Sequence, residues 1–213
     1  MTTKEARERR EPLVLLGLGV AALVVSGISP LDRLTWVLEV FPAVAAALIF
    51  IFLYRRLRFT PLVYRLVLLH ALVLMVGGHY SYAKVPAGYW VQDLLGLARN
   101  PYDRLGHFMQ GFVPAVVARE VLLRKTPLRP GGWLSFLSVA VCLAFSAFYE
   151  FTEWWAALSL GESADAFLGT QGDPWDTQWD MFMCFTGSIL SLLIFTRLHD
   201  RQLAREGEAG GLG

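Results

Sequence analysis

The sequence predicts an all-α, polytopic membrane protein, and three observations support this fold class. Of the 213 residues, 55% are hydrophobic and only 17% are charged, so the chain is more apolar than an ordinary soluble domain. The apolar residues fall into six long runs, and the basic residues gather on alternate connections between these runs. Together these features predict one bundle of about six transmembrane helices and no second domain.

Six apolar runs approach the length of about 20 residues that a membrane-spanning helix needs. The predicted spans are residues 13–28, 34–54, 62–78, 101–123, 133–158 and 174–198. The first run is expected to stay in the protein rather than act as a signal peptide, because acidic residues precede it and no small-residue cleavage site follows. Residues 1–12 are predicted to form a cytoplasmic N-terminal segment, and residues 200–213 a flexible cytoplasmic tail.

The distribution of Lys and Arg predicts the orientation of the spans. With the N-terminus inside, 15 of the 19 basic residues fall on the cytoplasmic side, and four fall on the outer side: Arg33, Lys84, Arg99 and Arg104. Tyr and Trp residues cluster at the outer ends of the spans, as is typical of a membrane interface. We therefore expect a multi-pass protein of the bacterial inner (cytoplasmic) membrane with both termini in the cytoplasm and membrane lipid as its surroundings.

Ionisable side chains gather at the outer ends of the last three predicted spans. They form pairs spaced three or four residues apart, so both members of a pair share one helix face: Asp103 and His107, Glu150 and Glu153, Asp176 and Asp180. All three pairs lie within about two helical turns of one membrane surface, a depth of about 10 Å. Facing helices in bundles build metal sites from such carboxylates and imidazoles. The pattern therefore predicts a divalent metal site.

Other interpretations of this cluster stay open. Asp103 and Asp176 each follow a cap residue and a proline, so these two acids could serve only to stabilise helix starts. Capping does not account for the ionisable residues deeper in the spans, each of which costs at least ~2.5 kcal/mol to insert. Their compensation could be a metal, a network of ion pairs that includes Arg104 and a protonated His107, or a proton or ion pathway.

Several residues outside the three pairs carry weaker expectations. His79, at the end of the third span, is a weaker candidate ligand from a fourth helix. Asp165 is a loop acid that could fold over the site. Glu120 is predicted to form a surface ion pair, and His199 to be an incidental residue of the tail.

Small residues predict where helices approach closely. Gly77, Gly78, Gly106 and Gly111 are expected to lie at helix contacts, since small side chains let backbones approach each other in lipid. The two cysteines lie in apolar runs without a CxxC or zinc-type spacing, and both are expected to be small buried hydrophobes: Cys142 and Cys184.

Four segments of the chain resemble the YjdF-like family of bacterial inner-membrane proteins. The segments are HYSYAKVP at 79–86, YDRLGHF at 102–108, FYEFTEWW at 148–155 and LGTQGDPWDTQWDM at 168–181. The likeness extends from about the second predicted span to the sixth. It implies an inner-membrane protein and no particular activity.

A weaker likeness is to the VanZ-like proteins, which are associated with resistance to glycopeptide antibiotics. Asp103-Arg104-x-x-His107-Phe108 is similar to the Asp-Lys-x-x-His-Phe motif of that family. Glu153 stands where that family has Gln, and Asp176 and Asp180 are spaced one residue wider than its late acidic pair. This likeness implies a role in the cell envelope.

The preferred functional hypothesis is metal-dependent chemistry on a lipid-linked or envelope substrate. A metal-activated water would attack the substrate, with Glu153 as the base and His107 beside it. The alternatives are a proton- or ion-coupled transporter and a scaffold or accessory protein whose polar cluster is structural. No phosphate loop, nucleotide fingerprint or nucleophile motif is present in the sequence, and no nucleic-acid partner is expected.

Overall fold

The structure, a computed structural model, is entirely helical over the residues that it describes, which are 3–160 and 171–210. In these ranges it has seven α-helices and one 3₁₀ helix and no strand: α1 Thr3–Ser26, α2 Arg33–Leu53, α3 Pro61–Tyr80, η1 Tyr82–Lys84, α4 Pro86–Leu95, α5 Tyr102–Lys125, α6 Gly132–Leu160 and α8 Asp176–Gly210. The predicted all-α class is confirmed.

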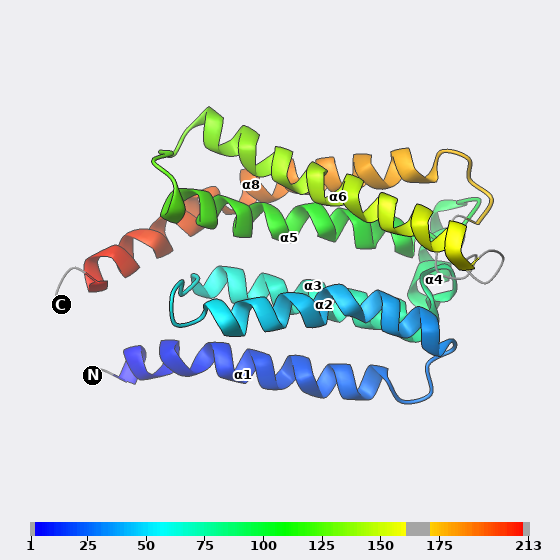
Figure 1. The fold of residues 1–213 in the computed structure, drawn as a ribbon, viewed down its shortest axis with the longest axis horizontal. Coiled ribbons are helices and arrows are strands. Elements are labelled where there is room, and N and C mark those ends of the chain that lie inside the picture. Colours follow the sequence, from blue (N-terminus) through cyan, green and yellow to red (C-terminus); the bar gives the residue numbers. More distant parts are fainter. Residues whose placement is uncertain (1–2, 161–170, 211–213) are drawn as a thin grey trace.

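The long helices run side by side in two halves (Figure 1). One half contains α1, α2 and α3, and the other contains α5, α6 and α8. Helix α3 packs on α1, α2 and α5, and α5 packs on α3, α6 and α8, so α3 and α5 join the two halves. Both chain ends lie at one end of the bundle, here called the termini end. Helix α4 and the start of α8 lie at the opposite end, here called the α4 end.

The outer surface of the bundle is apolar, as a membrane requires. Phe41, Phe52, Trp133 and Leu193 expose between 66% and 76% of their surface. Four of the described helices are long and apolar enough to cross a membrane, namely α2, α3, α6 and α8 over Asp176–Arg205. A chain with such side chains facing outward is a membrane protein of several spans. That α1 and α5 also span stays a prediction, because both carry charged residues.

Two helices extend beyond the predicted spans. Helix α1 begins at Thr3, within the segment that was expected to precede the first span, and α8 continues to Gly210. Residues 200–210 are therefore helical, while 211–213 lie outside the described residues, and a flexible cytoplasmic tail from residue 200 stays a prediction. Both extensions are rich in Arg and Glu, which favour helix.

The connection between the third and fourth predicted spans contains a helix that was not expected. Helix α4 begins with Pro86 at its first turn and ends at Gly96, which has the left-handed φ of 62° typical of a helix end. Trp90 and Leu94 are 75% and 81% exposed, whereas Gly88 is buried. Because its apolar side chains face outward from the end of the bundle, α4 has the pattern of a helix that lies in a membrane interface.

The turn between α1 and α2 is fixed by polar contacts at the α4 end. Asp32 Oδ1 accepts a hydrogen bond from the Thr35 backbone N–H at 2.7 Å and caps α2. This hydrogen bond lowers the pKa of Asp32, which lies outside the spans. Trp36 Nε1 donates to Ser26 Oγ at 3.1 Å. These contacts hold the end of α1 against the start of α2.

Helices α5 and α8 touch backbone to backbone. A Cβ at Gly111 would overlap the carbonyl oxygen of Cys184, and a Cβ at Gly187 would overlap that of Phe108. The Cys142 thiol of α6 donates to the Gly111 carbonyl oxygen at 3.7 Å. The predicted glycine contact at Gly111 and the burial of both cysteines are confirmed.

An apolar layer fills the middle of the bundle between the two ends. Val113, Ala115 and Val116 of α5 are at most 1% exposed, and Cys142 and Cys184 are fully buried beside Ala115. These side chains separate the polar groups of the α4 end from those of the termini end.

Candidate metal centre

The structure gathers three acids around His107 at the α4 end. His107 Nε2 lies 3.7 Å from Asp103 Oδ1 and 3.9 Å from Asp180 Oδ2, and His107 Nδ1 lies 3.7 Å from Glu150 Oε1. These side chains come from α5, α6 and α8, and each residue is at most 8% exposed. The predicted convergence of three helices on one pocket is therefore present.

The glycine contact between α5 and α8 sets this convergence. His107 lies one helical turn before Gly111, and Asp180 lies one turn before Cys184. Because Gly111 and Cys184 touch, the two turns that carry His107 and Asp180 are also adjacent. The same small residue that lets the helices meet thus places the imidazole beside the carboxylate.

The hydrogen bonds of His107 leave one ring nitrogen available as a ligand. Nδ1 lies 3.1 Å from Gln110 Oε1, and a carboxamide oxygen only accepts, so Nδ1 carries the proton. The lone pair of Nε2 then points toward Asp103 and Asp180. A metal-binding histidine commonly donates its second N–H to such an acceptor, which fixes the orientation of the ring.

The dimensions of this group fit a small cation. Asp103, His107 and Asp180 each offer a ligand atom, and these atoms lie within 4.8 Å of one another. Ligands at about 2.1 Å from a tetrahedral ion are about 3.4 Å apart. The observed 3.7 and 3.9 Å around Nε2 need only a small contraction to meet that spacing.

Two carboxylate oxygens in the group lack hydrogen-bond partners. Glu150 Oε1 and Asp180 Oδ1 are buried and accept no hydrogen bond from any described residue. Orphaned acceptors of this kind are rare in folded proteins and call for an explanation such as a bound ion or water. The donor set and its orphaned oxygens therefore fit a divalent cation.

Two further acids face the pocket. Glu39 of α2 is 5% exposed, and its carboxylate interacts with Asp103 and with the Tyr82 hydroxyl. Glu153 interacts electrostatically with Glu39, Asp103, Glu150 and Asp180. Glu39 and Glu153 therefore face the same pocket from the α2 and α6 sides.

Arginines neutralise the acids at the rim of the pocket. Asp176 forms an ion pair with Arg99. The guanidinium nitrogens of Arg99 also lie 3.5 Å from Asp103 Oδ2 and 3.7 Å from Asp173 Oδ2. Arg104 pairs with Asp173 at 2.8 Å. Asp176 was predicted as a metal ligand, but the structure places it against Arg99. Arg104, which the ion-pair interpretation placed in the cluster, forms its ion pair at the rim with Asp173.

An amide pair holds this rim together. The Asn100 backbone N–H donates to Gln171 Oε1 at 3.1 Å, and Gln171 Nε2 donates back to the Asn100 carbonyl at 3.0 Å. The Asn100 side chain donates to Val85 O at 3.0 Å and fills the space above Gly88 of α4. The segment that carries Arg99 is thereby fixed beside the start of α8.

His79, the weaker candidate ligand, does not join the group around His107. His79 Nδ1 makes a hydrogen bond to the Ser26 carbonyl oxygen at 2.9 Å, and its ring contacts Tyr80 edge to face. The structure thus places His79 at the junction of α3 with α1. Asp165 lies outside the described residues.

A second buried polar cluster lies at the termini end. Glu120 and His199 are fully buried, and His199 Nε2 is 2.9 Å from Glu120 Oε2. The prediction of Glu120 as a surface ion pair and of His199 as an incidental tail residue is therefore wrong. The reason is that α8 continues past the expected end of its span and packs His199 against α5.

Every charge in this second cluster has a partner. Glu120 accepts hydrogen bonds from the Thr60 backbone N–H at 3.0 Å and from Thr60 Oγ1 at 2.8 Å, and it pairs with Arg124 at 2.7 Å. Arg119 donates to His199 Nδ1 at 2.9 Å and to Asp200 at 2.6 Å. Since arginine only donates, His199 Nδ1 accepts, and its Nε2–H donates to Glu120.

Sequence reasoning missed Glu39 and Arg99, although the first carried a signal. Glu39 is the one acid within the predicted span 34–54, and a lone acid in an apolar span needs a buried partner. Arg99 carried no such signal, because it stands in a connection. Its position depends on Asn100 and Gln171, which are far apart in sequence.

Comparisons with known proteins agree with the helical membrane architecture. The family described as "Predicted membrane protein (DUF2238)" matches residues 11–201. The chain is 54% identical over 185 residues to the "Inner membrane protein YjdF" of Escherichia coli (strain K12), which covers 87% of this chain and 88% of that protein. No solved structure matches.

Proposed function

The chain belongs to the DUF2238 family of predicted membrane proteins, and from this premise we propose that it is an inner-membrane protein that binds one divalent metal ion. His107 Nε2, Asp103 and Asp180 would hold the ion, with Glu150 beside them. The observation that carries this proposal is the convergence of buried ligand atoms from α5 and α8 around one free imidazole nitrogen.

The charge balance of the pocket supports a cation. Arg99 offsets Asp176 and part of Asp103, whereas Asp180, Glu150, Glu153 and Glu39 face the pocket together with one imidazole. Burying carboxylates without partners costs several kcal/mol. A divalent ion between the carboxylates would offset this cost, and it would bind to Asp180 Oδ1 or Glu150 Oε1, which have no hydrogen-bond partner among the described residues.

The mixture of ligand types favours a transition metal over calcium or magnesium. Imidazole nitrogen suits Zn²⁺, Fe²⁺ or Mn²⁺ when carboxylates complete the site, whereas Ca²⁺ and Mg²⁺ prefer oxygen alone. A bound ion of this kind would acidify a water molecule for attack on a substrate. Glu153, which stands outside the atoms around Nε2, would take the proton. The substrate would be a lipid-linked or envelope molecule that reaches the α4 end.

The orientation that fits this proposal places the termini end in the cytoplasm and the site near the outer membrane face. Both termini and the α2–α3 and α5–α6 connections lie at the termini end (Figure 1). These parts of the chain carry 15 of its 19 basic residues, which predicts a cytoplasmic location. We propose six spans, α1 and α5 in addition to the four apolar helices that they run alongside.

Among the alternatives, the apolar layer argues for a closed site rather than for a transport pathway. Val113, Ala115 and Val116 lie between the His107 pocket and the Glu120–His199 cluster. In the described helices α5, α6 and α8, the polar side chains at this depth are small buried ones such as Ser188 and Ser191, and no acid lies among residues 108–118, 134–146 or 181–198 to receive a proton or ion. The likeness to VanZ-like proteins stays a prediction.

Elemental mass spectrometry of the purified protein tests the proposal. The full chain, extracted in mild detergent and dialysed against trace Zn²⁺, Mn²⁺ and Fe²⁺, is expected to retain about one metal ion per chain. His107→Ala and Asp180→Ala are each expected to lose it. His79→Gln is the matched control, because His79 lies near the same end of the bundle but bonds to Ser26.

The proposal is wrong if the folded wild-type protein takes up no metal, or if His107→Ala retains as much as the wild type. Size-exclusion elution of each variant as a single peak shows that loss of metal does not reflect unfolding. If metal is absent and the cluster variants fold normally, the scaffold interpretation is favoured.

A further inference from the structure

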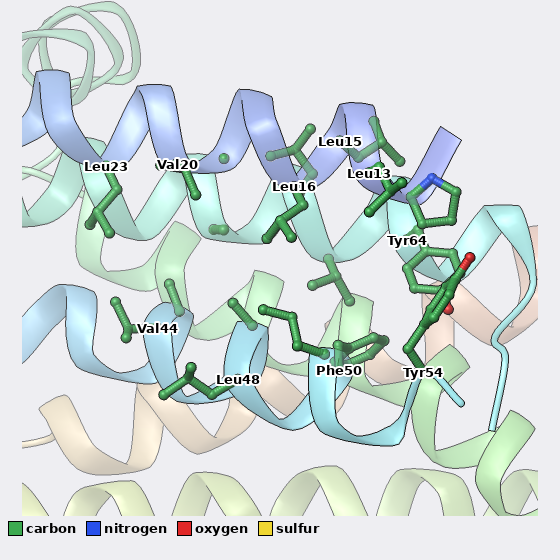
Figure 2. Close-up of a pocket in the computed structure, with 18 of the residues that line it drawn as sticks. Leu13, Leu15, Leu16, Val20, Leu23, Val44, Leu48, Phe50, Tyr54 and Tyr64 are labelled. Carbon is green, nitrogen blue, oxygen red and sulfur yellow. The ribbon is translucent and has the colours of Figure 1, made fainter. Parts of the chain in front are cut away.

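An apolar groove lies between α1 and α2, far from the His107 pocket. Helix α3 forms its floor, and it encloses about 570 Å³. In Figure 2, Leu13, Leu16 and Leu23 of α1 face Val44 and Tyr54 of α2 across this space. Helices α1 and α2 each pack on α3. The groove is therefore a space between α1 and α2, both of which pack on α3.

Small side chains and one aromatic anchor give the groove its shape. Gly19, Ala43, Ala47 and Ala71 line it and leave its middle wide. At the α4 end Trp36 packs in the same cluster as Leu23 and Ala43 of the lining, and its indole donates to Ser26 Oγ at 3.1 Å. From there the lining extends toward the termini end, where the chain connects α2 to α3.

The termini end of the groove is basic and aromatic. Tyr54, Tyr64 and Arg55 line it there, and within the described residues Arg55 is the one charged member of the lining. Arg58 stands beside them and donates to the Tyr54 hydroxyl at 3.0 Å. An apolar slot that ends in tyrosines and arginines matches the two parts of a phospholipid, its chain and its phosphate.

The length of the groove also fits an acyl chain. Its lining on α1 runs from Pro12 to Leu23, which is about 16 Å at about 1.5 Å per residue. One leaflet of the hydrocarbon core is about half of 30 Å thick. The lining therefore spans one leaflet, with Arg55 at the depth of the headgroups.

We propose that this groove binds one acyl chain of an anionic phospholipid from the leaflet at the termini end, with the phosphate held by Arg55. The occupant is an anionic lipid rather than a neutral one because a guanidinium pairs with phosphate oxygens directly, and no acid in the lining competes for it. This proposal is independent of the metal site.

Photocrosslinking in vesicles tests the proposal. The full chain is reconstituted in phosphatidylcholine that contains a small fraction of phosphatidylglycerol with a diazirine in its acyl chain. Mass spectrometry of the peptides is expected to find the label concentrated on 13–23 of α1 and 44–52 of α2. A phosphatidylcholine probe with the same diazirine is expected to label these segments several-fold less.

Two pairs of variants separate the headgroup from the chain. Arg55→Gln is expected to remove the preference for phosphatidylglycerol, whereas Arg56→Gln keeps it, because Arg56 contacts the lining residue Phe52 but does not itself line the groove. Ala47→Phe fills the groove and is expected to reduce labelling by both probes. Ala21→Phe makes the same change on an exposed part of α1 and is expected to leave labelling unchanged.

Three results would overturn the proposal. Label spread evenly over the exposed apolar faces of all helices would mean an ordinary lipid surface. Equal loss of headgroup preference in Arg55→Gln and Arg56→Gln would mean a general basic surface without a phosphate site. Crosslinks from the groove to a second copy of the chain, in place of lipid, would mean a protein interface.

Discussion

The bundle buries ionisable side chains at both of its ends, and the two clusters are built differently. At the termini end, Glu120 accepts from Thr60, Arg124 and His199, and each cation has an acceptor. At the α4 end, Glu150 and Asp180 each keep a buried oxygen without a hydrogen-bond partner among the described residues. The charged groups of the first cluster are paired within the protein, whereas the second cluster would be stabilised by a bound ion or water. The contrast distinguishes a structural network from a candidate binding site.

The largest expected effect on stability follows from removing Glu120, the acid at the centre of the cluster at the termini end. Glu120→Ala leaves the Thr60 backbone N–H and the His199 Nε2–H without their acceptor and removes the carboxylate that pairs with Arg124. Breaking a buried charged network in this way costs about 3–5 kcal/mol. Thermal unfolding in detergent should show a Tm lowered by about 10 °C.

Metal content per folded Glu120→Ala chain is expected to equal that of the wild type, because the apolar layer separates the two clusters. A variant that keeps its Tm, or that loses metal while remaining folded, would mean that the two ends of the bundle are not the distinct regions described here.

A smaller effect is expected at the contact that positions the metal ligands. The added methyl of Gly111→Ala would overlap the Cys184 carbonyl oxygen and push α5 away from α8. Overpacking of this kind costs about 1–3 kcal/mol. Because His107 and Asp180 lie one turn from this contact, metal retention by elemental mass spectrometry is expected to fall with the Tm.

Gly17→Ala is the matched control for Gly111→Ala, since nothing lies within 4 Å of a Cβ at that position. The control is expected to raise stability slightly, because alanine favours helix over glycine. If Gly111→Ala keeps both its Tm and its metal, the helix contact does not set the site.

The smallest effect on stability is expected in the cluster around His107, where a substitution should stabilise the metal-free protein or leave its stability unchanged. In the metal-free protein Asp180→Asn removes one of several buried acids that repel one another, so its Tm is expected to equal or exceed that of the wild type. With metal in about 100-fold excess over its Kd, the wild type gains about 2.7 kcal/mol and the variant does not.

Paired melting curves, one in chelator and one in added Zn²⁺ or Mn²⁺, measure the stability of Asp180→Asn. An Asp180→Asn variant that unfolds earlier than the wild type in chelator would show that Asp180 is structural, as Glu120 is.

The sequence predicted the cluster around His107 to the extent that helix periodicity determines it. Asp103 and His107 share a helix face, and Asp180 enters the same depth from a neighbouring span, so their meeting followed from spacing and topology. Glu150 lies in the cluster around His107 for the same reason. Asp176 instead pairs with Arg99, which is positioned by the hydrogen bonds between Asn100 and Gln171, and no periodic pattern in the sequence encodes such a pairing.

The cluster at the termini end was not predictable from local pattern. Glu120 beside Arg124 has the spacing of an ordinary surface ion pair, and His199 follows an apolar run as a tail residue would. Their burial depends on the continuation of α8 and on the return of the α2–α3 connection to the same place. Both are tertiary effects, which override local preference.

Composition alone predicted some of the spans. Helices α2, α3, α6 and α8 are apolar enough to be recognised as spans by themselves. Helix α5 is less apolar, because it carries Asp103 and His107 and, further along, Arg119 and Glu120. Helix α4 was missed because a ten-residue helix is too short for a span, although Pro86 and Gly96 marked its ends.

The Glu120 network has a consequence for the biogenesis of the protein. Its members come from positions 60, 120 and 199, so His199 leaves the ribosome well after Thr60 and Glu120. Until that moment Glu120 and Arg119 stand in the nascent bundle without His199. A truncated chain that lacks the end of α8 would therefore present uncompensated charge at the membrane, which is a defect that membrane proteases can recognise.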